Sequence, residues 1–530
     1  MSSRASMIAQ LQNAKPFDLI VIGGGITGCG VAYEAAAKGA RVLVLEKNDF
    51  ASGTSSRSTK LIHGGIRYLK HADFRLVKEG VTHRQSLIDA APHLVHPVQF
   101  LYPVHEGDPD PLWMLRIGMM MYDWFAGPRN LLKHRVLDQA GVLADVPVLK
   151  AEGLRGGALY ADCITDDARL TVSVARAAAG RGAVLANYVE VTRFLYDAAG
   201  RAVGVEAVDR LGGGEPLALH AKAILNATGP WVDHLREMDE AGRPPVLRPT
   251  KGVHLTVPRE RLPIGRPVVM HGPDKRMMFA VPRGAFTYLG TTDTDYKDDP
   301  AGVVATREDV TYILRAANHL FPSAHLTDAD VVSTWAGLRT LAATSETAGP
   351  SQVSRDYKLH TSKSGVVSVA GGKLTAFQAM AHAIVRTVLP GVSHAEVELK
   401  IEGAGKAPSE AEAAALGSEY GLTGADVTEL WSRYGTGSRA ILAAMAPGSG
   451  RTGMLVAEAV HAVEHEFAVT LSDVLNRRTS QLLFSRDNGL GSVEAVATAV
   501  GSLLGWSETE RQGQVAAYRT EVARMQAWKA

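Results

Sequence analysis

The sequence has few of the features that define specialised classes of protein. Its 530 residues include two cysteines, Cys29 and Cys163, too few for a disulfide framework and typical of a reducing compartment. We expect both to be small buried residues. No apolar run reaches the roughly 18 residues of a membrane span, and residues 1–16 lack the apolar core of a secretory signal. The sequence therefore predicts a cytoplasmic protein, with peripheral attachment to the cytoplasmic face of the inner membrane as the alternative.

The chain also lacks an excess of either charge. Its 56 basic and 55 acidic residues leave a net charge of +1, so no global field attracts nucleic acid, and we expect no nucleic-acid partner. Hydrophobic residues make up 46% of the chain and charged residues 21%, which is an ordinary globular balance with ample core. A chain of this length predicts two or three domains.

The stretch 17–28, FDLIVIGGGITG, matches the fingerprint of a dinucleotide-binding site. Residues 17–22 form an apolar run typical of a buried parallel strand, and residues 40–46 predict a second strand that ends in the carboxylate of Glu46. A glycine motif alone is weak evidence. Its position between a strand and a helix, with an acid-tipped strand following, predicts a bound dinucleotide.

The residues of this motif have separate expected roles. Gly23 permits the tight turn, Gly25 lets the backbone approach a pyrophosphate at the positive helix N-terminus, and Gly28 lets the helix pack on the strand. Glu46 can accept a hydrogen bond from a ribose hydroxyl. Residues 448–453, GSGRTG, fit the same glycine pattern but lack the flanking strands, so we expect a loop between two helices there.

Two later segments look like parts of the same nucleotide-binding fold. The first has a helix over 167–180, a strand over 183–187, a strand pair around 202–208 and an apolar strand from 223. The second has a strand from 365 that runs into a helix ending near residue 389. Both segments bring small residues to a strand end, where a chain can pass close to a cofactor. These residues are Ala227, Thr228 and Gly229 in the first segment and Gly371 and Gly372 in the second.

The sequence between these segments has a different pattern of apolar and polar residues. Residues 253–257, 267–271, 276–281 and 285–290 predict antiparallel strands, as in a sheet with one wall facing a ligand. From about residue 400 onward the pattern changes to short amphipathic helices with no strand signal.

The loop at 52–68, SGTSSRSTKLIHGGIRY, is dense in hydroxyl groups and backbone N–H donors, which suit a pyrophosphate. It then supplies Lys60, His63, Arg67 and Tyr68 around a glycine pair. Cationic groups in this position suit the edge of an isoalloxazine ring or an anionic substrate. The alternative is a solvated basic loop.

Several longer motifs go beyond the glycine fingerprint. They are KLIHGGIRYL (60–69), DDARL (166–170), NATGPW (226–231), LGTTDTDY (289–296) and GGKLT (371–375). Together they resemble the FAD-dependent, aerobic-type glycerol-3-phosphate dehydrogenases, and the similarity covers nearly the whole chain. The resemblance implies FAD as cofactor and oxidation of sn-glycerol 3-phosphate to dihydroxyacetone phosphate by hydride transfer to flavin N5. It also implies that the electrons pass to a membrane quinone.

The predicted fold class is α/β, with a Rossmann-like FAD-binding domain interleaved with an antiparallel-sheet substrate domain, plus a C-terminal all-helical domain. We expect the oxidoreductase region to cover residues 1–400 and the helical domain residues 401–530. The FAD-binding segments are about 15–80, 160–235 and 345–395, and the substrate-domain segments are about 85–160 and 240–345.

The resemblance implies a set of cofactor contacts at matching positions. Those expected at the ADP and pyrophosphate are Gly23, Gly25, Gly28, Glu46, Thr54, Ser55 and Ser56. Those expected to line the flavin are Lys60, Leu61 and His63. The strand-end contacts are Ala227, Thr228, Gly229, Gly371, Gly372, Lys373, Leu374 and Thr375.

Oxidising a secondary alcohol with a flavin requires a hydride acceptor, a base for the hydroxyl proton and fixed cations for the phosphate. By resemblance we expect His63 to be the base, with the alternative that it only hydrogen-bonds the flavin. Arg339 is the expected clamp for phosphate or hydroxyl, and Lys373 completes the catalytic set. The expected substrate-binding residues are Arg67, Tyr68, His254, Arg339 and Arg355, with exposed salt bridges as their alternative role.

Two departures from the family pattern lie near this predicted pocket. Residues 376–378 read AFQ where the family commonly has TYR, and Thr340 stands where proline is usual. They leave two alternatives open. One is an oxidase of the same fold that reduces O2 to H2O2, and the other is a low-turnover flavoprotein that binds a phosphorylated metabolite.

Residues 111–125 are the most apolar helical segment, flanked by Arg116 and Arg129. A core helix or the interface of a homodimer is one interpretation, and a helix that dips into a bilayer to receive quinone is the other. Residues 461–465, HAVEH, match an inverted zinc motif. We favour a polar helix face there and expect no metal.

Overall fold

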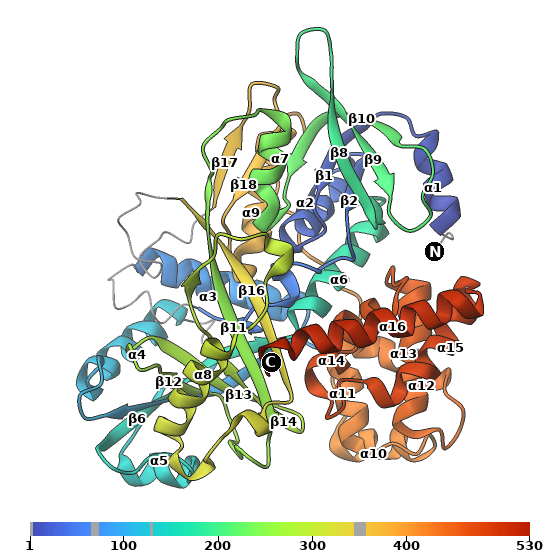
Figure 1. Ribbon diagram of the computed structural model, residues 1–530. Coiled ribbons are helices and arrows are strands. Elements are labelled where there is room, and N and C mark those ends of the chain that lie inside the picture. The colour runs from blue at the N-terminus through green and yellow to red at the C-terminus, as the bar shows by residue number, and fades with distance from the viewer. Residues whose placement is uncertain (1–3, 65–73, 128–130, 344–356, 530) are drawn as a thin grey trace.

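The computed structural model describes residues 4–64, 74–127, 131–343 and 357–529. Over these residues the chain forms two β-sheets and a C-terminal helical module, which occupy the top, the lower left and the lower right of Figure 1. Each sheet collects strands from separate stretches of the sequence, so the two sheets are interleaved. This arrangement confirms the predicted fold class.

The first sheet has the strand order β17-β18-β10-β1-β2-β7. β1 (Phe17–Ile22) runs parallel to β2 (Val42–Glu46) on one side and to β10 (Leu217–Asn226) on the other, so their carboxyl ends lie at the same edge. Residue 40, which we expected in the second strand, precedes β2. The other strands are β7 (Val184–Asn187), β8 (Val189–Tyr196), β9 (Ala202–Asp209), β17 (Lys358–Thr361) and β18 (Val367–Ala370).

Both faces of the first sheet are covered, which explains why β1 reads as a nearly continuous apolar run. Leu19 and Val21 face one side, and Ile20 and Ile22 face the other. The helices on the Leu19 side are α2 (Ile26–Ala37), α6 (Asp167–Gly180) and α9 (Phe377–Val388). Those on the Ile20 side are α1 (Arg4–Gln12) and α7 (Val232–Asp239).

The second sheet is mainly antiparallel and has the order β15-β11-β14-β13-β12-β4-β6-β3, with β16 beside β11 and β5 beside β6. β11 (Leu247–Pro258) pairs with β16 (Ser333–Ala342) along its length. The other strands are β3 (Leu61–Ile62), β4 (Val95–His105), β5 (Arg135–Leu137), β6 (Leu154–Thr165), β12 (Val268–His271), β13 (Met277–Arg283), β14 (Phe286–Gly290) and β15 (Thr294–Asp295). Its helices are α3 (Phe74–Ala90), α4 (Leu112–Ala126), α5 (Gln139–Asp145) and α8 (Arg307–Leu320).

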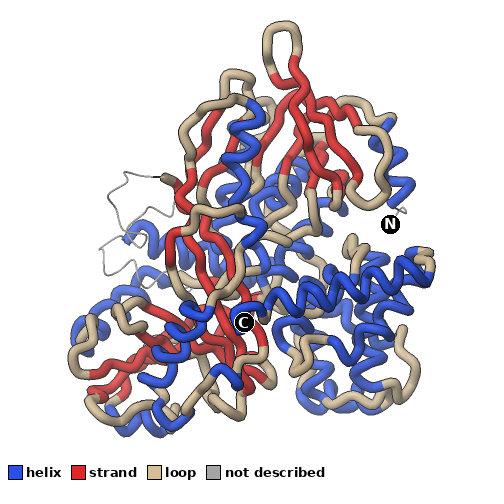
Figure 2. The backbone as a smooth tube through the Cα atoms, viewed as in Figure 1, coloured by secondary structure: helices blue, strands red, loops and turns tan. Residues whose placement is uncertain are grey.

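The helical module comprises residues 410–529, and Figure 2 draws it without a strand over the residues that the structure describes. Ser409, Thr423 and Ser507 each begin a helix with a capping box, in which an acid three residues later returns the hydrogen bond. Its helices are α10 (Glu410–Ser418), α11 (Gly424–Tyr434), α12 (Ser438–Ala443), α13 (Gly450–His465), α14 (Gln481–Phe484), α15 (Val493–Leu504) and α16 (Glu508–Met525). A π-helical turn, Asp473–Arg478, precedes α14.

One local expectation was wrong. The GSGRTG stretch (448–453), expected to be a loop between helices, is a loop only in its first two residues, because α13 begins at Gly450. Ser449 lies at the N-cap, so the last four residues of the motif form the first helical turn. Cys29 and Cys163 are both buried, as expected.

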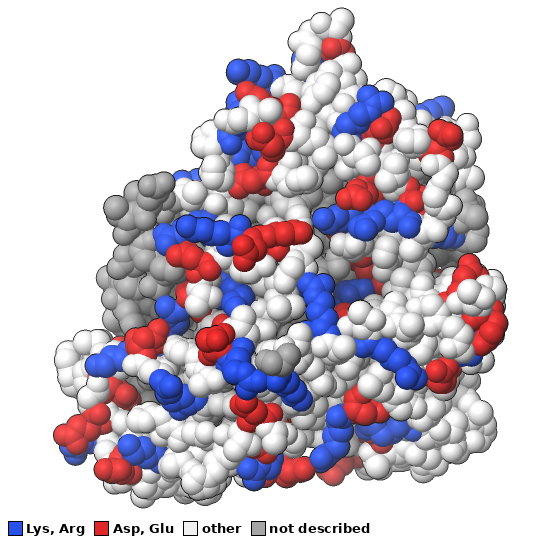
Figure 3. Space-filling model, viewed as in Figure 1, with Lys and Arg blue, Asp and Glu red and all other residues white. Residues whose placement is uncertain are grey.

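Charge and hydropathy agree with the sequence. Basic and acidic side chains are interspersed over the face shown in Figure 3. Within the described ranges, every helix is too short or too polar to cross a bilayer.

Burial of His93 makes folding stability depend on pH. His93 is buried between the second sheet and the helical module, beside Gly403. Burial, aided by the positive charges of Arg169 and His96, lowers its pKa to about 4. The unfolded chain takes up this proton near pH 6.5, so the folded state is favoured above that pH and loses stability as the pH falls toward 4.

We therefore predict that the His93→Gln variant loses less stability on acidification than the wild-type protein. Each pKa unit is worth about 1.4 kcal/mol, so the effect is on the order of 2–3 kcal/mol. Urea unfolding midpoints at pH 7 and pH 4.5 measure it. The exposed His394 supplies the control variant, His394→Gln, and an equal acid-induced loss in His93→Gln and wild type would contradict the prediction.

Candidate functional site

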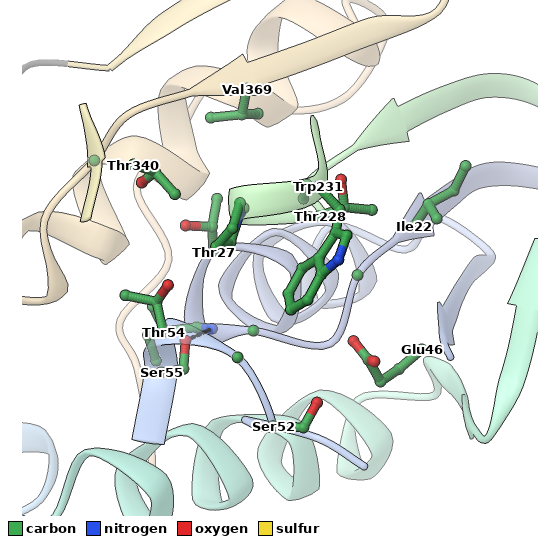
Figure 4. Close-up of a pocket in the computed structure, with 18 of the residues that line it drawn as sticks. Ile22, Thr27, Glu46, Ser52, Thr54, Ser55, Thr228, Trp231, Thr340 and Val369 are labelled. Carbon is green, nitrogen blue, oxygen red and sulfur yellow. Dashed lines mark hydrogen bonds between the residues drawn. The ribbon is translucent and has the colours of Figure 1, made fainter. Parts of the chain in front are cut away.

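A deep cleft lies where β1, β10 and β18 end, with an empty volume of about 1390 Å³ that is partly open to solvent. Figure 4 shows the cleft between Thr340 and Thr54 on one side of the view and Glu46 and Ile22 on the other. The cleft is therefore elongated, as an extended ligand such as a dinucleotide requires.

The glycine turn forms the floor of the cleft. Gly23 has φ +112°, and a Cβ there would lie 2.6 Å from the carbonyl oxygen of Ala227. A Cβ on Gly28 would lie 1.9 Å from the carbonyl oxygen of Gly23, so Gly28 supports the turn and is not among the lining residues. Gly25 is the N-cap of α2 and lines the cleft. The positive end of the α2 dipole thus faces the cleft, which suits a phosphate.

Glu46 lies at one end of the cleft, at the tip of β2. Its Oε2 accepts a hydrogen bond from the backbone N–H of Gly24 at 2.7 Å, and its Oε1 accepts one from Asn48 at 2.8 Å. Burial raises the pKa of this carboxyl, although the two backbone donors oppose the shift. Each carboxylate oxygen keeps a lone pair for a further donor, as a ribose hydroxyl would be.

The hydroxyl-rich loop lies across from the glycine turn. The Ser55 hydroxyl accepts from the N–H of Ile26 at 2.9 Å, and the Thr54 hydroxyl donates to the carbonyl of Leu338 at 2.8 Å. Both residues line the cleft, as expected from the sequence. Ser56 does not, because it is buried with its hydroxyl toward the carbonyl of Gly53.

Lys60 and Leu61, expected to line the flavin, have their side chains elsewhere. The Lys60 Nζ is buried and lies 2.5 Å from Oδ1 of Asp167, at the start of α6. Leu61 is buried in the apolar cluster around Phe100. An apolar environment demands a partner for a buried ammonium, and Asp167 supplies one.

The third segment closes the cleft from the side of β18. Its lining residues are Gly371, Gly372, Lys373 and Leu374, whereas Thr375 is buried behind them. Ala227, Thr228 and Gly229 line the cleft at the end of β10, as expected. Small residues at both strand ends leave room for a ligand.

The AFQ departure has a structural explanation at Phe377. Its ring is buried against Gly30 of α2, where a Cβ would lie 2.8 Å from Phe377 Cδ2. An aromatic ring is sufficient at this helix contact, so the missing phenol hydroxyl is not needed for packing.

Arg339, on β16, lies next to the cleft residue Thr340. Its guanidinium donates to Asp293 Oδ1 at 3.1 Å, to the Thr291 hydroxyl at 3.1 Å and to the Thr292 carbonyl at 3.0 Å. The side chain is 26% exposed. These three bonds fix the position of the guanidinium and its charge.

His254, expected to bind substrate, is 2% exposed and is absent from the cleft lining. Its ring stacks on Trp335 at 4.8 Å, and its Nε2 is 3.0 Å from the Thr59 hydroxyl. Burial, together with the charges of Arg339 and Lys60, holds its pKa well below the ordinary value. His254 is therefore a neutral supporting residue next to Arg339.

Of the four remaining residues that we expected in the site, the structure describes only His63. His63 is exposed just after β3 and is not among the residues that line the cleft. Arg67, Tyr68 and Arg355 lie outside the described residues.

Other residues that line the cleft were missed by the sequence analysis. Trp231 lies in the middle of Figure 4, with the Lys47 Nζ 4.5 Å from its ring centroid. It belongs to the NATGPW motif, which was the signal that could have identified it. Thr27 and Ser52 lie in the glycine motif and the hydroxyl-rich loop but were not singled out, and nothing in the sequence marked Val189 and Val191.

The HAVEH stretch lies in α13, with the rings of His461 and His465 4.7 Å apart. A search of the described ranges finds no group of three or more His, Cys, Asp or Glu residues that could hold a metal.

Comparison with known proteins agrees with this geometry. Residues 18–378 match the profile of the FAD dependent oxidoreductases, and residues 397–511 match the C-terminal domain of alpha-glycerophosphate oxidase. The aerobic glycerol-3-phosphate dehydrogenases of Staphylococcus epidermidis and Staphylococcus aureus are each 36% identical over 526 residues, which is 96% of this chain and 93% of theirs. The chain belongs to the FAD-dependent glycerol-3-phosphate dehydrogenase family.

Solved structures agree with this family. The glycerol-3-phosphate dehydrogenase from Bacillus halodurans complexed with FAD is 34% identical, with a TM-score of 0.82 over 99% of this chain and 98% of that one. The L-alpha-glycerophosphate oxidase from Mycoplasma pneumoniae with FAD bound is 17% identical, with a TM-score of 0.53 over 73% of this chain and 98% of that one, and so shares the fold.

The cofactor of this family is FAD, and the cleft fits it. The turn at Gly23 and Gly28 has no space for a Cβ, the start of α2 faces the cleft, and the half-buried Glu46 lies at the tip of β2, where an acid can accept a ribose hydroxyl. These features of the chain itself fit a dinucleotide.

We predict that Gly28→Ala abolishes FAD retention. The added Cβ would clash with the Gly23 carbonyl at 1.9 Å, and relieving such overpacking costs about 1–3 kcal/mol or more. Visible flavin absorbance of the purified variant is the measurement. Gly180→Ala is the matched control, because its Cβ meets no atom within 4 Å. A yellow Gly28→Ala protein with wild-type flavin content would contradict this account of the turn.

Proposed function

We propose that the protein oxidises sn-glycerol 3-phosphate to dihydroxyacetone phosphate with FAD and passes the electrons to a membrane quinone. The observation that carries the proposal is the position of Arg339, which directly precedes the cleft residue Thr340 on β16 and whose charge acts on the buried His254, although Arg339 itself is absent from the cleft lining. A fixed cation next to the wall of a dinucleotide cleft suits a phosphorylated substrate. The aerobic dehydrogenases that share 36% identity support the same substrate.

Glu46, Gly25 and Ser55 would hold the adenosine and pyrophosphate half of FAD, and Lys373 with Gly371 and Gly372 would lie at the flavin half. When bound, FAD supplies the acceptor for the hydride that leaves C2 of the alcohol. The expected contacts Lys60, Ser56 and Thr375 would support these residues from behind.

The protein's own groups would carry the remaining steps. His63 takes the proton of the C2 hydroxyl as general base, since an imidazole has its pKa near the working pH. Arg339 binds the substrate anion, with Asp293 and Thr291 fixing its guanidinium. His254 stays neutral and keeps Trp335 and Thr59 in position beside Arg339.

We predict that His63→Asn lowers turnover by about 10²–10⁴-fold because the general base is lost, and that Arg339→Ala raises KM because the anion clamp is lost. Both variants should keep FAD. Anaerobic flavin bleaching on addition of glycerol 3-phosphate measures the reaction in the wild type and both variants. His325→Asn is the control, since His325 has φ 43° and asparagine tolerates this region.

Two outcomes would contradict the assignments. Near-normal turnover in His63→Asn, or an unchanged KM in Arg339→Ala, would remove that residue from its role. Failure of the wild type to bleach would favour a low-turnover flavoprotein that binds a phosphorylated metabolite. Comparing oxygen uptake with reduction of a soluble quinone analogue separates the dehydrogenase from an oxidase that makes H2O2.

Helix α4 is the surface that we assign to the membrane. Trp113 and Trp124 are 63% and 76% exposed, and Ile117 and Met120 lie exposed between them, so one face of the helix is apolar and open. The opposite face is anchored in the second sheet through Leu115, Met119 and Tyr122. This arrangement argues against a core helix.

Exposed basic residues lie on α4 and in the segment that contacts it. Arg116 is exposed on α4 itself, and Lys133 and Arg135 are exposed on either side of His134, which bonds to Asp123 of α4, while Arg129 lies outside the described residues. Tryptophan with flanking cations is typical of helices that lie in the interface of an anionic bilayer. The apolar face of α4 would thus bring the protein to the quinone pool.

We predict that Trp113→Gln/Trp124→Gln reduces co-sedimentation with phosphatidylglycerol vesicles by about tenfold, since each tryptophan contributes on the order of 1 kcal/mol or more to binding. Leu503→Gln is the control, because Leu503 is exposed on α15. Unchanged vesicle binding with conversion of a dimer to a monomer would instead make α4 a homodimer interface.

A further inference from the structure

The helical module is bonded to the loop that follows Glu46. The carboxylate of Asp49 is fully buried and accepts hydrogen bonds from Arg478 Nη1 at 2.5 Å and Nη2 at 2.9 Å. It also accepts one from Arg477 Nε at 2.5 Å. Both arginines belong to the π-helical turn Asp473–Arg478, and such turns are often found at functional sites.

An aromatic contact strengthens this connection. The ring of Phe467, in the helical module, meets the ring of Phe50 edge to face at 5.2 Å. Phe50 in turn abuts the glycine turn, since a Cβ on Gly24 would lie 2.4 Å from its Cδ1. The N–H of Ala51 donates to the Gly24 carbonyl at 3.0 Å. The loop 47–51 therefore lies between the helical module and the glycine turn.

The module also holds the corner between β7 and β8. Asn187 Nδ2 donates to the carbonyl of Phe467 at 2.8 Å, and the Tyr188 hydroxyl donates to Asp473 Oδ1 at 2.6 Å. The N–H of Tyr188 donates to the Asn48 carbonyl at 2.8 Å, which joins the corner to the loop. Val189 follows directly and lines the cleft.

We propose that Arg478 and Arg477 are positioning residues for the cofactor, which hold the Glu46 loop in the shape that retains the adenosine half of FAD. The inference rests on the proposed placement of that half at Glu46. Because Asn48 donates to Glu46 and is adjacent to Asp49, a shift of Asp49 moves the donors that orient the Glu46 carboxylate.

The chemistry of the ion pair supports this role. Burial alone would raise the pKa of Asp49, but the charges of Arg478 and Arg477 outweigh it and lower the pKa, so the carboxylate is ionised. The Arg478 guanidinium meets the carboxylate with two parallel N–H groups. Lysine cannot reproduce this fork, although it keeps the charge.

Three variants test the proposal. Asp49→Asn/Arg478→Gln removes the ion pair without leaving a buried unpaired charge, and Arg478→Lys keeps the charge but loses the fork. Arg486→Ala is the control, because Arg486 also links the helical module to the rest of the chain, through an exposed ion pair with Glu260 at 2.7 Å. Titration of each apoprotein with FAD, and separately with ADP, gives the two dissociation constants.

We expect the double variant and Arg478→Lys to bind FAD and ADP about tenfold or more weakly, which corresponds to about 1.4 kcal/mol, and Arg486→Ala to bind both within about twofold of wild type. Excess FAD should restore turnover of the first two variants, since their flavin half is not displaced. Far-ultraviolet circular dichroism of the apoproteins checks that the variants are folded. If the double variant is unfolded, the dissociation constants of Arg478→Lys test the proposal.

Wild-type affinity for FAD and ADP in a folded Arg478→Lys protein would overturn the proposal, as would a loss of turnover that excess FAD does not restore. Glu46→Gln separates this failure from failure of the site itself. If Glu46→Gln weakens FAD binding and the Arg478 variants do not, the positioning role is wrong while the site stands. If Glu46→Gln binds FAD and ADP as wild type does, the placement of adenosine is wrong.

Discussion

The close contact between the glycine turn and the end of β10 is the constraint on which the site depends. Gly23 has no room for a side chain because Ala227 lies against it, and Gly28 has none because Gly23 lies above it. These approaches bring the start of α2 to the edge of the first sheet, where the strands β1, β10 and β18 end together. The cleft exists because three backbones meet there with little side-chain volume between them.

The interleaved chain also brings the second sheet to this edge of the first sheet. The second sheet is joined to the first through the loop after β2, through β16 and through the entry to α6, so its Arg339 lies next to a residue of the cleft wall. The ion pair of Lys60 with Asp167 ties the first loop to α6 at the same place. Residues of the cleft and Arg339 come from distant parts of the sequence and are therefore joined through these buried contacts.

Much of the fold could be predicted from the sequence because its signals are local. The strand over 17–22 and the helix over 167–180 were predicted with the bounds that the structure has, since apolar periodicity and capping residues act over a few positions. The GSGRTG stretch was harder, because a helix without a strong cap begins inside it.

The sequence predicts site residues well where the backbone makes the contact. It predicts them less well where the contact depends on which distant side chain is the partner. Most of the expected glycines and strand-end residues line the cleft, whereas Gly28 and Thr375 lie behind it. Lys60 was expected at the flavin, but its partner Asp167 is 107 residues away and no local pattern reveals that pairing. His254 likewise stacks on Trp335, a neighbour that only the strand register of β11 and β16 defines.

The bond between Asp49 and Arg478 joins residues 429 positions apart. During synthesis, the loop after β2 leaves the ribosome long before its arginine partners exist. Under the proposed role of these arginines, the Glu46 end of the cleft takes its final shape only after residues 473–478 have been synthesised, so the nascent chain would gain its full affinity for FAD late.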